Sequence, residues 1–385
     1  MQKDVLHFVL LYMTRIQQLI MYIIMNRLKK TLNSLLRMQI DYRNEVNNMK
    51  IGFFLSSNED AVSTYSDKAI AIGLKKMGYD IEIIQNKEEK LNILENPFFD
   101  AIFFQKTIQC KGHTEQYIKH LKGRVHLIHI DDDFQDMVVK EHIDTLNITD
   151  LILVGTNQHK SALAHYTYTP VEVFSCVVDI ENYPYTLVRK KDNNPLIIGW
   201  QQGCADAYVR EFLMIKGPLN ALHERYGIEL HLYGWHMGKD YPDRRQVVLE
   251  ALPFSRCVEY QPIKEYLSNI VPQVAKSDIF IMPYNMSDKD RIGKSGFGLK
   301  RVMSLGIPVV VTNSLHHRSL IENGVTGFLA STEEEWFDNI SALIENIELR
   351  ERFSLNARRL IEEQYNEEEV LKRFVESVNK HISIF

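Results

Sequence analysis

The sequence predicts an α/β protein with two parallel sheets in series, and three observations support this prediction. Short apolar runs such as KIGFFL and VHLIHI alternate with amphipathic segments of helix length, which is typical of parallel strands covered by helices on both faces. The alternation stops at the charged segment RKKDNNP, residues 189–195, and starts again at PLIIGW. The chain of 385 residues also exceeds the usual size of one hydrophobic core.

The composition is that of an ordinary globular protein and excludes several classes. Hydrophobic residues make up 45% and charged residues 25% of the chain. The net charge of −5 gives no overall attraction to nucleic acid, so any anion site must be local. The four cysteines (Cys110, Cys176, Cys204 and Cys257) lie far apart and match neither a metal-binding pair nor a disulfide ladder. We therefore expect the protein to reside in a reducing cytoplasm.

Residues 1–48 differ from the rest of the chain in their pattern of apolar and charged residues. Two apolar runs, VLHFVLLYMT and LIMYIIM, are separated by Arg15, and seven basic residues stand against three acidic ones. An arginine in the middle disfavours a bilayer span, and no cleavage site of small residues follows. Two interpretations remain: an amphipathic helix that anchors the protein in the membrane surface, or a helix packed on the protein or on a partner. A domain could also begin at Met49, the first residue of MKIGFFL.

Residues 49–187 are predicted to form one Rossmann-like domain. Alternating apolar runs predict its strands, and segments with helical spacing predict its helices. We expect strands at 50–57, 79–85, 98–106, 125–130, 150–156 and 171–177, and helices at 67–78, 115–123 and 157–166.

Residues 188–365 are predicted to form a second Rossmann-like domain. We expect strands at 195–200, 228–235, 257–262, 278–284, 307–312 and 326–330, and helices at 208–227, 263–277, 296–305 and 317–324. Residues 366–385 are predicted to form one further helix. Because ligands bind beyond the carboxyl ends of the strands in such sheets, two facing domains would enclose a cleft.

The segment KSGFGLKRVMSLGIPVVVT, residues 294–312, predicts an anion site. Ser295 is a suitable N-cap, and Gly306 followed by Pro308 is a suitable stop. The first amides of the helix would belong to Gly296, Phe297 and Gly298, and the basic residues Lys294, Lys300 and Arg301 surround them. Bare amides at a helix N-terminus attract anions, so a diphosphate matches this cluster best. The alternative is a capped surface helix with solvated basic residues.

The stretch from VAKSDIFIMPY through LKRVMSLGIPVVVTNSLHHRSLIENGVTGFLA to LRERFSLNARRLI resembles the donor-binding half of the GT-B glycosyltransferases of family 4, the glycosyl transferases group 1. The resemblance covers most of 188–365, and the first domain only in its alternation. It implies a GT-B fold with the donor on the second domain, the acceptor on the first, and helix 366–385 crossing back to the first domain. It also implies that the quoted segment holds the diphosphate of an activated sugar and that the anomeric configuration is retained.

The sequence departs from this family at one informative place. The family commonly has two glutamates eight positions apart, of which the second contacts the ribose and the first lies by the sugar. Gly293 and Arg301 occupy these positions here, which leaves the nucleotide, the sugar and the activity open. Asp288 and Asp290 lie just upstream and could supply a carboxylate, or could belong to a solvated loop.

Further donor-site residues are implied by the resemblance. Gly199 and Gly203 follow the first strand of the second domain, where the family places backbone close to the phosphates. The ends of the next two strands would face the base and ribose; the alternative for the aromatic residues is ordinary packing. This second set comprises Tyr233, Gly234, Tyr260, Gln261, Pro262 and Ile263.

Candidate catalytic residues follow the strand at 125–130. Asp131, Asp132 and Asp133 resemble an acidic run in related transferases and could act in catalysis or acceptor binding, or else only cap a helix. His129, and also His113, could act as acid, base or orienting group. Ser56 and Ser57 stand where family members often have glycines. Aspartates can bind a metal, but the resemblance implies charge neutralisation by basic side chains and amides, so we expect no metal and no cofactor beyond the NDP-sugar.

The sequence therefore predicts a glycosyltransferase that moves a sugar from an NDP-sugar to a glycan or lipid-linked glycan, in cell-surface polysaccharide assembly. It is expected in the cytoplasm, at the inner face of the membrane if residues 1–48 form an anchor. Two alternatives remain open: a non-catalytic GT-B partner subunit and a sugar-nucleotide epimerase.

Overall fold

A computed structural model describes most of the chain from residue 49 onward. The described residues are 49–55, 67–86, 89–90, 92–93, 98–105, 121–131, 143, 146–180, 195–236, 244–262, 265–286, 296–382 and 384–385. Lys50–Phe385 form one compact unit. The predicted segment 1–48, the predicted linker up to residue 194 and most of the predicted helix 115–123 lie outside the described residues.

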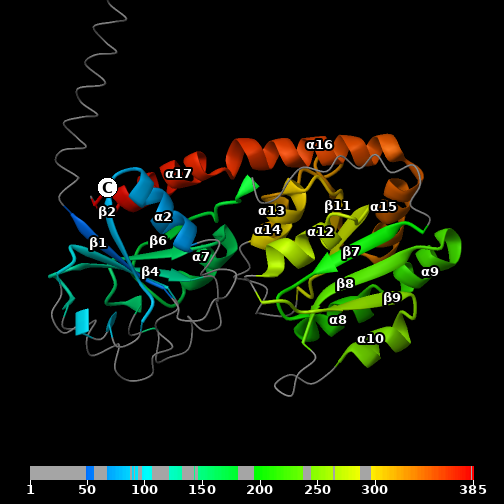
Figure 1. Cartoon of the computed structure of the whole chain (residues 1–385), viewed down its shortest axis with the longest axis horizontal. Helices are drawn as coiled ribbons and strands as arrows, with labels where there is room; N and C mark the ends of the chain where they lie inside the picture. Colours follow the sequence, from blue (N-terminus) through cyan, green and yellow to red (C-terminus); the bar gives the residue numbers. More distant parts are fainter. Residues whose placement is uncertain are drawn as a thin grey trace, which may run out of the picture. The chain divides into compact units, whose positions relative to one another are not determined.

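The first sheet has six parallel strands in the order β2-β1-β3-β4-β5-β6 (Figure 1). They are β1 (Lys50–Phe54), β2 (Asp80–Ile84), β3 (Ala101–Gln105), β4 (His126–Asp131), β5 (Leu151–Val154) and β6 (Val171–Val173). Helices α2 (Lys68–Lys76) and α7 (Asn157–Leu163) belong to this part of the chain. The apolar runs are buried on both faces, and the rings of Phe53 and Phe103 stack at 4.5 Å between their centroids.

The second sheet also has six parallel strands, in the order β12-β11-β10-β7-β8-β9. They are β7 (Ile197–Gln201), β8 (Glu229–Trp235), β9 (Ser255–Glu259), β10 (Ile279–Met282), β11 (Val309–Thr312) and β12 (Phe328–Ala330). Its helices are η4 (Ala205–Tyr208), α8 (Val209–Met214), α9 (Lys216–Tyr226), α10 (Arg245–Ala251), η5 (Tyr266–Ile270), α12 (Val271–Val274), α13 (Phe297–Ser304), α14 (Leu315–Arg318), α15 (Glu333–Glu345) and α16 (Ile347–Gln364). The predicted α/β architecture with two parallel sheets is confirmed.

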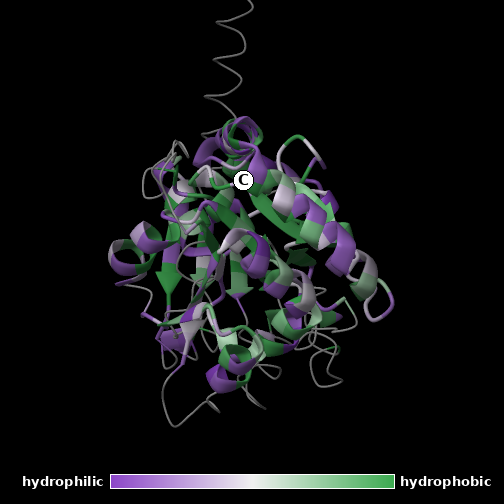
Figure 2. Ribbon diagram, turned by 90° about the vertical axis from the view of Figure 1, so that its right-hand side faces the viewer, coloured by the Kyte–Doolittle hydropathy of each residue, from purple (hydrophilic) through white to green (hydrophobic). Residues whose placement is uncertain are grey.

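Hydropathy separates the strands from the helices. Figure 2 shows strands mostly in hydrophobic colours, whereas the helices carry hydrophilic and hydrophobic stretches. Strands buried on both faces must be apolar throughout, while a covering helix needs one apolar stripe only. This is why short apolar runs predicted the strands so well.

Several predicted helix bounds were wrong, each for a local reason. The helix predicted at 208–227 is interrupted at Ile215, because Pro218 has no amide hydrogen and its ring clashes with the carbonyl four residues earlier. The helix predicted at 317–324 is instead α14, which begins earlier because Ser314 accepts a hydrogen bond from the amide of His317 at 3.0 Å. The helix predicted at 263–277 contains the π-helical turn η5.

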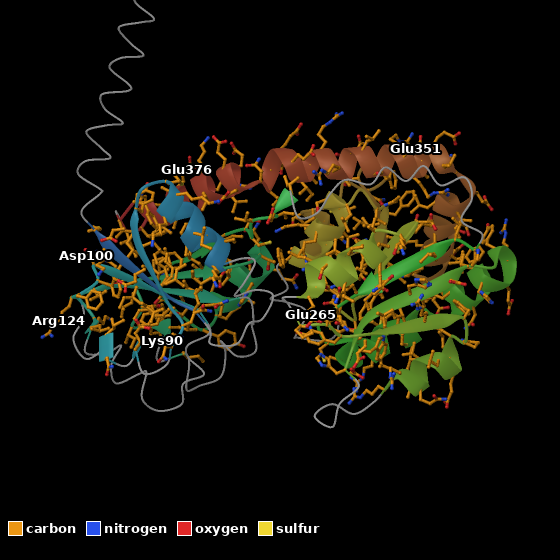
Figure 3. All side chains as sticks on the ribbon, viewed as in Figure 1. Lys90, Asp100, Arg124, Glu265, Glu351 and Glu376 are labelled. Carbon is orange, nitrogen blue, oxygen red and sulfur yellow. The ribbon has the colours of Figure 1, made fainter. Side chains whose placement is uncertain are left out.

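The last helix, α17 (Glu367–Asn379), packs on elements of the first sheet, against α2 and β6. The ring of Phe374 lies 5.7 Å from that of Phe103. Glu376 marks the exposed side of this helix, and Figure 3 labels it together with Glu351 on α16. The helix predicted at 366–385 ends at Asn379, whose side-chain amide donates to the Phe385 carbonyl at 2.7 Å and turns the chain back.

Candidate functional site

A cavity of about 270 Å³ lies at the carboxyl ends of β7, β8 and β9. This is the edge at which parallel α/β sheets bind their ligands. Glu265, labelled in Figure 3, directly precedes Tyr266 in its wall. The described lining residues are Gln201, Gln202, Gly203, Tyr233, Gly234, Glu259, Tyr260, Gln261, Tyr266, Ile270 and Arg301.

Gly234 shapes the floor of this cavity. Its φ of 105° lies in the region that favours glycine, and a Cβ at this position would lie 1.8 Å from the carbonyl oxygen of Gln202. The pairing of β8 with β9 shifts register between Tyr233 and Trp235. The ends of β7 and β8 therefore approach each other closely at Gly234.

Two side-chain contacts fix the wall of the cavity. The hydroxyl of Tyr266 donates to Oε1 of Gln201 at 2.6 Å, which orients the Gln201 amide. The ring of Tyr260 stacks on that of His236 with centroids 4.4 Å apart, and Nε2 of His236 lies 3.0 Å from the carbonyl oxygen of Gly203. A flat aromatic face beside oriented amides suits a planar heterocycle.

Tyr233 contributes to the wall and to the core at once. Its side chain is 1% exposed, and its hydroxyl donates to the carbonyl of Gln273 at 3.2 Å. Burial raises the pKa of Tyr233 to about 12. The phenol is therefore neutral at physiological pH and serves packing as well as the cavity.

Asp206 holds two segments beside the cavity. Its carboxylate accepts hydrogen bonds from the amide of His236 at 3.0 Å and from the amide of Arg244 at 3.3 Å. The residue is 3% exposed, so these bonds are made in a poorly solvated place. Asp206 thus positions His236, and through it the face of Tyr260.

Arg301 supplies positive charge to the cavity from α13. It is 8% exposed, and its guanidinium carbon lies 4.9 Å from the ring centroid of Tyr266 and 4.5 Å from that of Phe297. Cation–π contacts of this kind hold a guanidinium in a defined plane. Arg301, at the position where the sequence resemblance implies a glutamate, therefore lines the same cavity as Tyr233, Gly234, Tyr260 and Gln261.

The start of α13 differs from the predicted one. The N-cap is Gly296, with a φ of 68° and no side-chain cap, so the helix begins at Phe297. A Cβ on Gly296 would lie 2.4 Å from Nε2 of His316 and 2.6 Å from Leu320, so this turn requires glycine. Gly298 lies in the first turn of α13. Lys294 and Ser295 lie outside the described residues.

Six of the described residues that were predicted at the donor site do not line this cavity: Gly199, Pro262, Gly296, Phe297, Gly298 and Lys300. The amine of Lys300 donates to Oγ of Ser175 at 2.9 Å and lines a second cavity. Gly199 lies within β7, where a Cβ would meet Oγ of Ser277 at 2.2 Å, so its small size permits packing. The carbonyl of Pro262 accepts hydrogen bonds from the amides of Glu265 and Tyr266, and so it begins the next helical turn.

The predicted catalytic residues are only partly described. His129 and Asp131 belong to β4, and Asp131 ends it beside Val154 of β5. Nothing is described of their side chains. The other candidates, Asp132, Asp133, His113, Ser56, Ser57, Asp288, Asp290, Gly293 and Ile263, lie outside the described residues.

The described residues contain no cluster of three or more His, Cys, Asp or Glu side chains that could hold a metal ion. Within the same residues, no helix combines the length and apolar character needed to cross a bilayer.

Sequence reasoning missed Gln201, Gln202, Tyr266, His236 and Asp206. The glutamines directly follow a predicted strand of the second domain, and this position at the carboxyl edge could have identified them. Nothing in the spacing of the other three shows that they meet, because only the tertiary fold brings them together.

Two Rossmann-like parallel sheets with a cavity at a carboxyl edge are consistent with the GT-B form of glycosyltransferases. Residues 212–346 match the model of the family described as glycosyl transferases group 1. The protein is accordingly a glycosyltransferase in its domain content and fold. No curated protein matches the sequence.

Solved structures resemble the chain over most of its length. A glycosyltransferase from Rickettsia africae has a TM-score of 0.64 at 13% identity, covering 87% of this chain and 98% of its own. Sucrose-phosphate synthase from Thermosynechococcus elongatus has 0.63 at 10% identity, covering 86% and 99%. Anabaena HepE in complex with UDP and glucose has 0.63 at 13% identity, covering 86% and 100%. At sequence identities this low, the structural likeness establishes the fold alone.

Proposed function

We propose that the protein transfers a sugar from an NDP-sugar to an acceptor. The observation that carries this proposal is the cavity at the ends of β7–β9, where stacked Tyr260, the main chain at Gly234 and the cation of Arg301 meet. HepE, a neighbour in fold, holds UDP and glucose, which supports a nucleotide-sugar as the ligand here.

In this proposal the base lies against Tyr260 and Gln261, and the phosphates extend toward Gly203 and the N-terminus of α13. Lys294, Ser295, Phe297 and Gly298 would supply charge and amides there. Positive charge and fixed amides lower the barrier most when they face the charge that develops on the departing diphosphate. We assign that task to Arg301 and the start of α13 and leave Lys300 out, because its amine contacts Ser175. The proposal includes no metal ion.

The acceptor in this proposal is a glycan or lipid-linked glycan bound near the carboxyl end of β4, where Asp131, Asp132 and His129 lie in the sequence. We further propose retention of the anomeric configuration, on the family resemblance alone. Location in the cytoplasm, with attachment at the inner membrane face through residues 1–48, completes the proposal.

A second candidate is a non-catalytic GT-B partner subunit. The observation in its favour is Arg301, which occupies the cavity where the family carries a glutamate. A sugar-nucleotide epimerase is a third candidate, and it would need no acceptor.

One experiment separates the three candidates. Purified full-length protein is incubated with UDP-, GDP-, ADP- and dTDP-sugars while nucleotide release and sugar isomerisation are followed, and calorimetry measures binding of each nucleoside diphosphate. Binding with nucleotide release supports the transferase, and binding without turnover supports the partner subunit. Isomerisation without acceptor supports the epimerase. Absence of both binding and turnover across the panel would overturn the proposal.

A further inference from the structure

A second cavity, of about 250 Å³, is separate from the first in the residues that line it. Its described lining includes Thr156 at the start of α7, Ser175 after β6, Lys300 on α13, His316 and Ser319 on α14, and Arg373 on α17. No described residue lines both cavities. Since the lining comes from both sheets' surroundings, a molecule bound there would contact elements of each.

Two cations face this cavity. Lys300 is 3% exposed, and its amine donates to Oγ of Ser175 at 2.9 Å and to Sγ of Cys176 at 3.6 Å. It lies 4.6 Å from the ring centroid of Tyr365, and the guanidinium carbon of Arg373 lies 5.6 Å from the same centroid. The described lining residues include no aspartate or glutamate. Positive charge is therefore concentrated around one aromatic ring.

A histidine beside these cations is held neutral. His316 is 7% exposed, and its pKa lies well below the usual range because of burial first, and then of the nearby His317 and Lys300. Its Nε2 has no hydrogen-bond partner among the described residues. Burial therefore disfavours a positive charge on His316, and the nearby Lys300 adds to this effect.

The hydroxyl of Ser175 is arranged to donate. Because its oxygen accepts from the amine of Lys300, its proton is directed elsewhere; its contact with the Cys176 carbonyl is long, at 3.5 Å. A hydroxyl next to a buried ammonium, with a guanidinium across a ring, is a donor set for an oxyanion with several acceptor atoms.

We propose that this second cavity is a binding site for a phosphate group, held by Lys300, Arg373 and the hydroxyl of Ser175. The group could be free inorganic phosphate or a phosphate carried by a small organic molecule, and the chemistry of recognition is the same. A bound phosphate would join α13 and α17 through one ligand, and so would couple the second sheet's helices to the helix that packs on the first sheet.

The test measures binding of inorganic phosphate and of glycerol phosphate to the full chain by calorimetry. Arg373 is exposed, so Arg373→Met should fold, and it should weaken phosphate binding about tenfold or more, the usual effect of losing a charged hydrogen bond. Arg352→Met, which removes an exposed arginine of α16, is the matched control and should leave the affinity unchanged. Arg301→Met removes the cation of the first cavity and so separates phosphate bound there from phosphate bound in the second cavity.

The outcomes decide the proposal. Tighter binding of glycerol phosphate than of inorganic phosphate, lost in Arg373→Met, supports a carried phosphate, and the reverse order supports free phosphate. Absence of binding by either probe at 10 mM, on the order of the weakest useful affinity, overturns the proposal. The proposal is also overturned if Arg301→Met loses phosphate binding while Arg373→Met retains it, since the phosphate then occupies the first cavity.

Discussion

The hydroxyl of Tyr266 donates a hydrogen bond to Oε1 of Gln201 across 2.6 Å, and both residues line the cavity at the ends of β7–β9. This bond fixes which end of the amide faces a ligand. It also joins η5 to the end of β7, two elements 65 residues apart in sequence.

Tyr266→Phe should therefore lower the free energy of unfolding by about 1 kcal/mol, the usual contribution of one intramolecular hydrogen bond. It should also weaken nucleotide binding, because the Gln201 amide is then no longer held in one orientation. Calorimetry with UDP measures this effect. Tyr226→Phe, which removes a hydroxyl that contacts Glu345 on the surface, is the control and should bind normally. Equal affinities for the two variants would contradict the assigned role of Tyr266.

Gly234→Ala should destabilise the protein. The φ of 105° and the 1.8 Å approach to the Gln202 carbonyl leave no room for a methyl group. We expect a loss of about 3 kcal/mol in the free energy of unfolding, measured by chemical denaturation. Gly203→Ala, with no atom within 4 Å of its added Cβ, should cost far less. A stable Gly234→Ala variant would show that the strand ends can separate.

Arg301→Lys should reduce affinity for a nucleoside diphosphate more than affinity for the nucleoside. A lysine keeps the charge but loses the planar guanidinium that rests between Tyr266 and Phe297. We expect about a tenfold loss for UDP, as for a charged hydrogen bond. Competition titrations with UDP and uridine compare the two losses. A uniform loss for both ligands would place Arg301 at the ribose and not at the phosphates.

The ion pairs of Glu172 should make the free energy of unfolding fall at acidic pH. It lies in β6 and accepts from Lys380 at 2.6 Å, from His381 at 2.8 Å and from Lys160 at 3.0 Å. Burial alone would raise its pKa, but these partners outweigh burial and lower the pKa from 4.5 to about 2. The stabilisation is therefore fully present above pH 4.5 and is lost as the pH falls toward 2.

Glu172→Gln should accordingly lower the free energy of unfolding by about 1–2 kcal/mol at neutral pH, after allowance for solvent screening. The difference from the wild type should shrink as the pH falls from 4.5 to about 2. Urea denaturation across this range measures it, with the exposed Glu376→Gln as control. A difference that stays constant with pH would rule out the ionic origin.

The sequence predicted the fold better than the site, for a physical reason. The strands of a sheet covered on both faces must be apolar, and such runs as VVVT of β11 stand out without any knowledge of the tertiary structure. The interruption at Ile215 was missed because apolar spacing continues across Pro218. Helical periodicity reports burial and does not report a clash with the preceding turn.

For the cavity, positions at the carboxyl edge could be predicted and side-chain directions could not. Gly203, Gly234, Tyr260, Gln261 and Arg301 were each named from the sequence and line the cavity. Which face of α13 a residue occupies decides whether it lines the cavity at the ends of β7–β9 or the second cavity. Lys300 precedes Arg301 directly, and successive helix residues point about 100° apart. Their amine and guanidinium consequently lie in different cavities.

The aromatic cluster of the first sheet has a consequence for synthesis on the ribosome. The ring of Phe103 of β3 lies 5.7 Å from that of Phe374 and stacks on that of Phe385 at 6.0 Å, and Phe385 is 1% exposed. The early strands therefore leave the ribosome long before the rings that cover them are made. The apolar surface at Phe103 therefore stays without these two rings until the second sheet and the last helix have been translated.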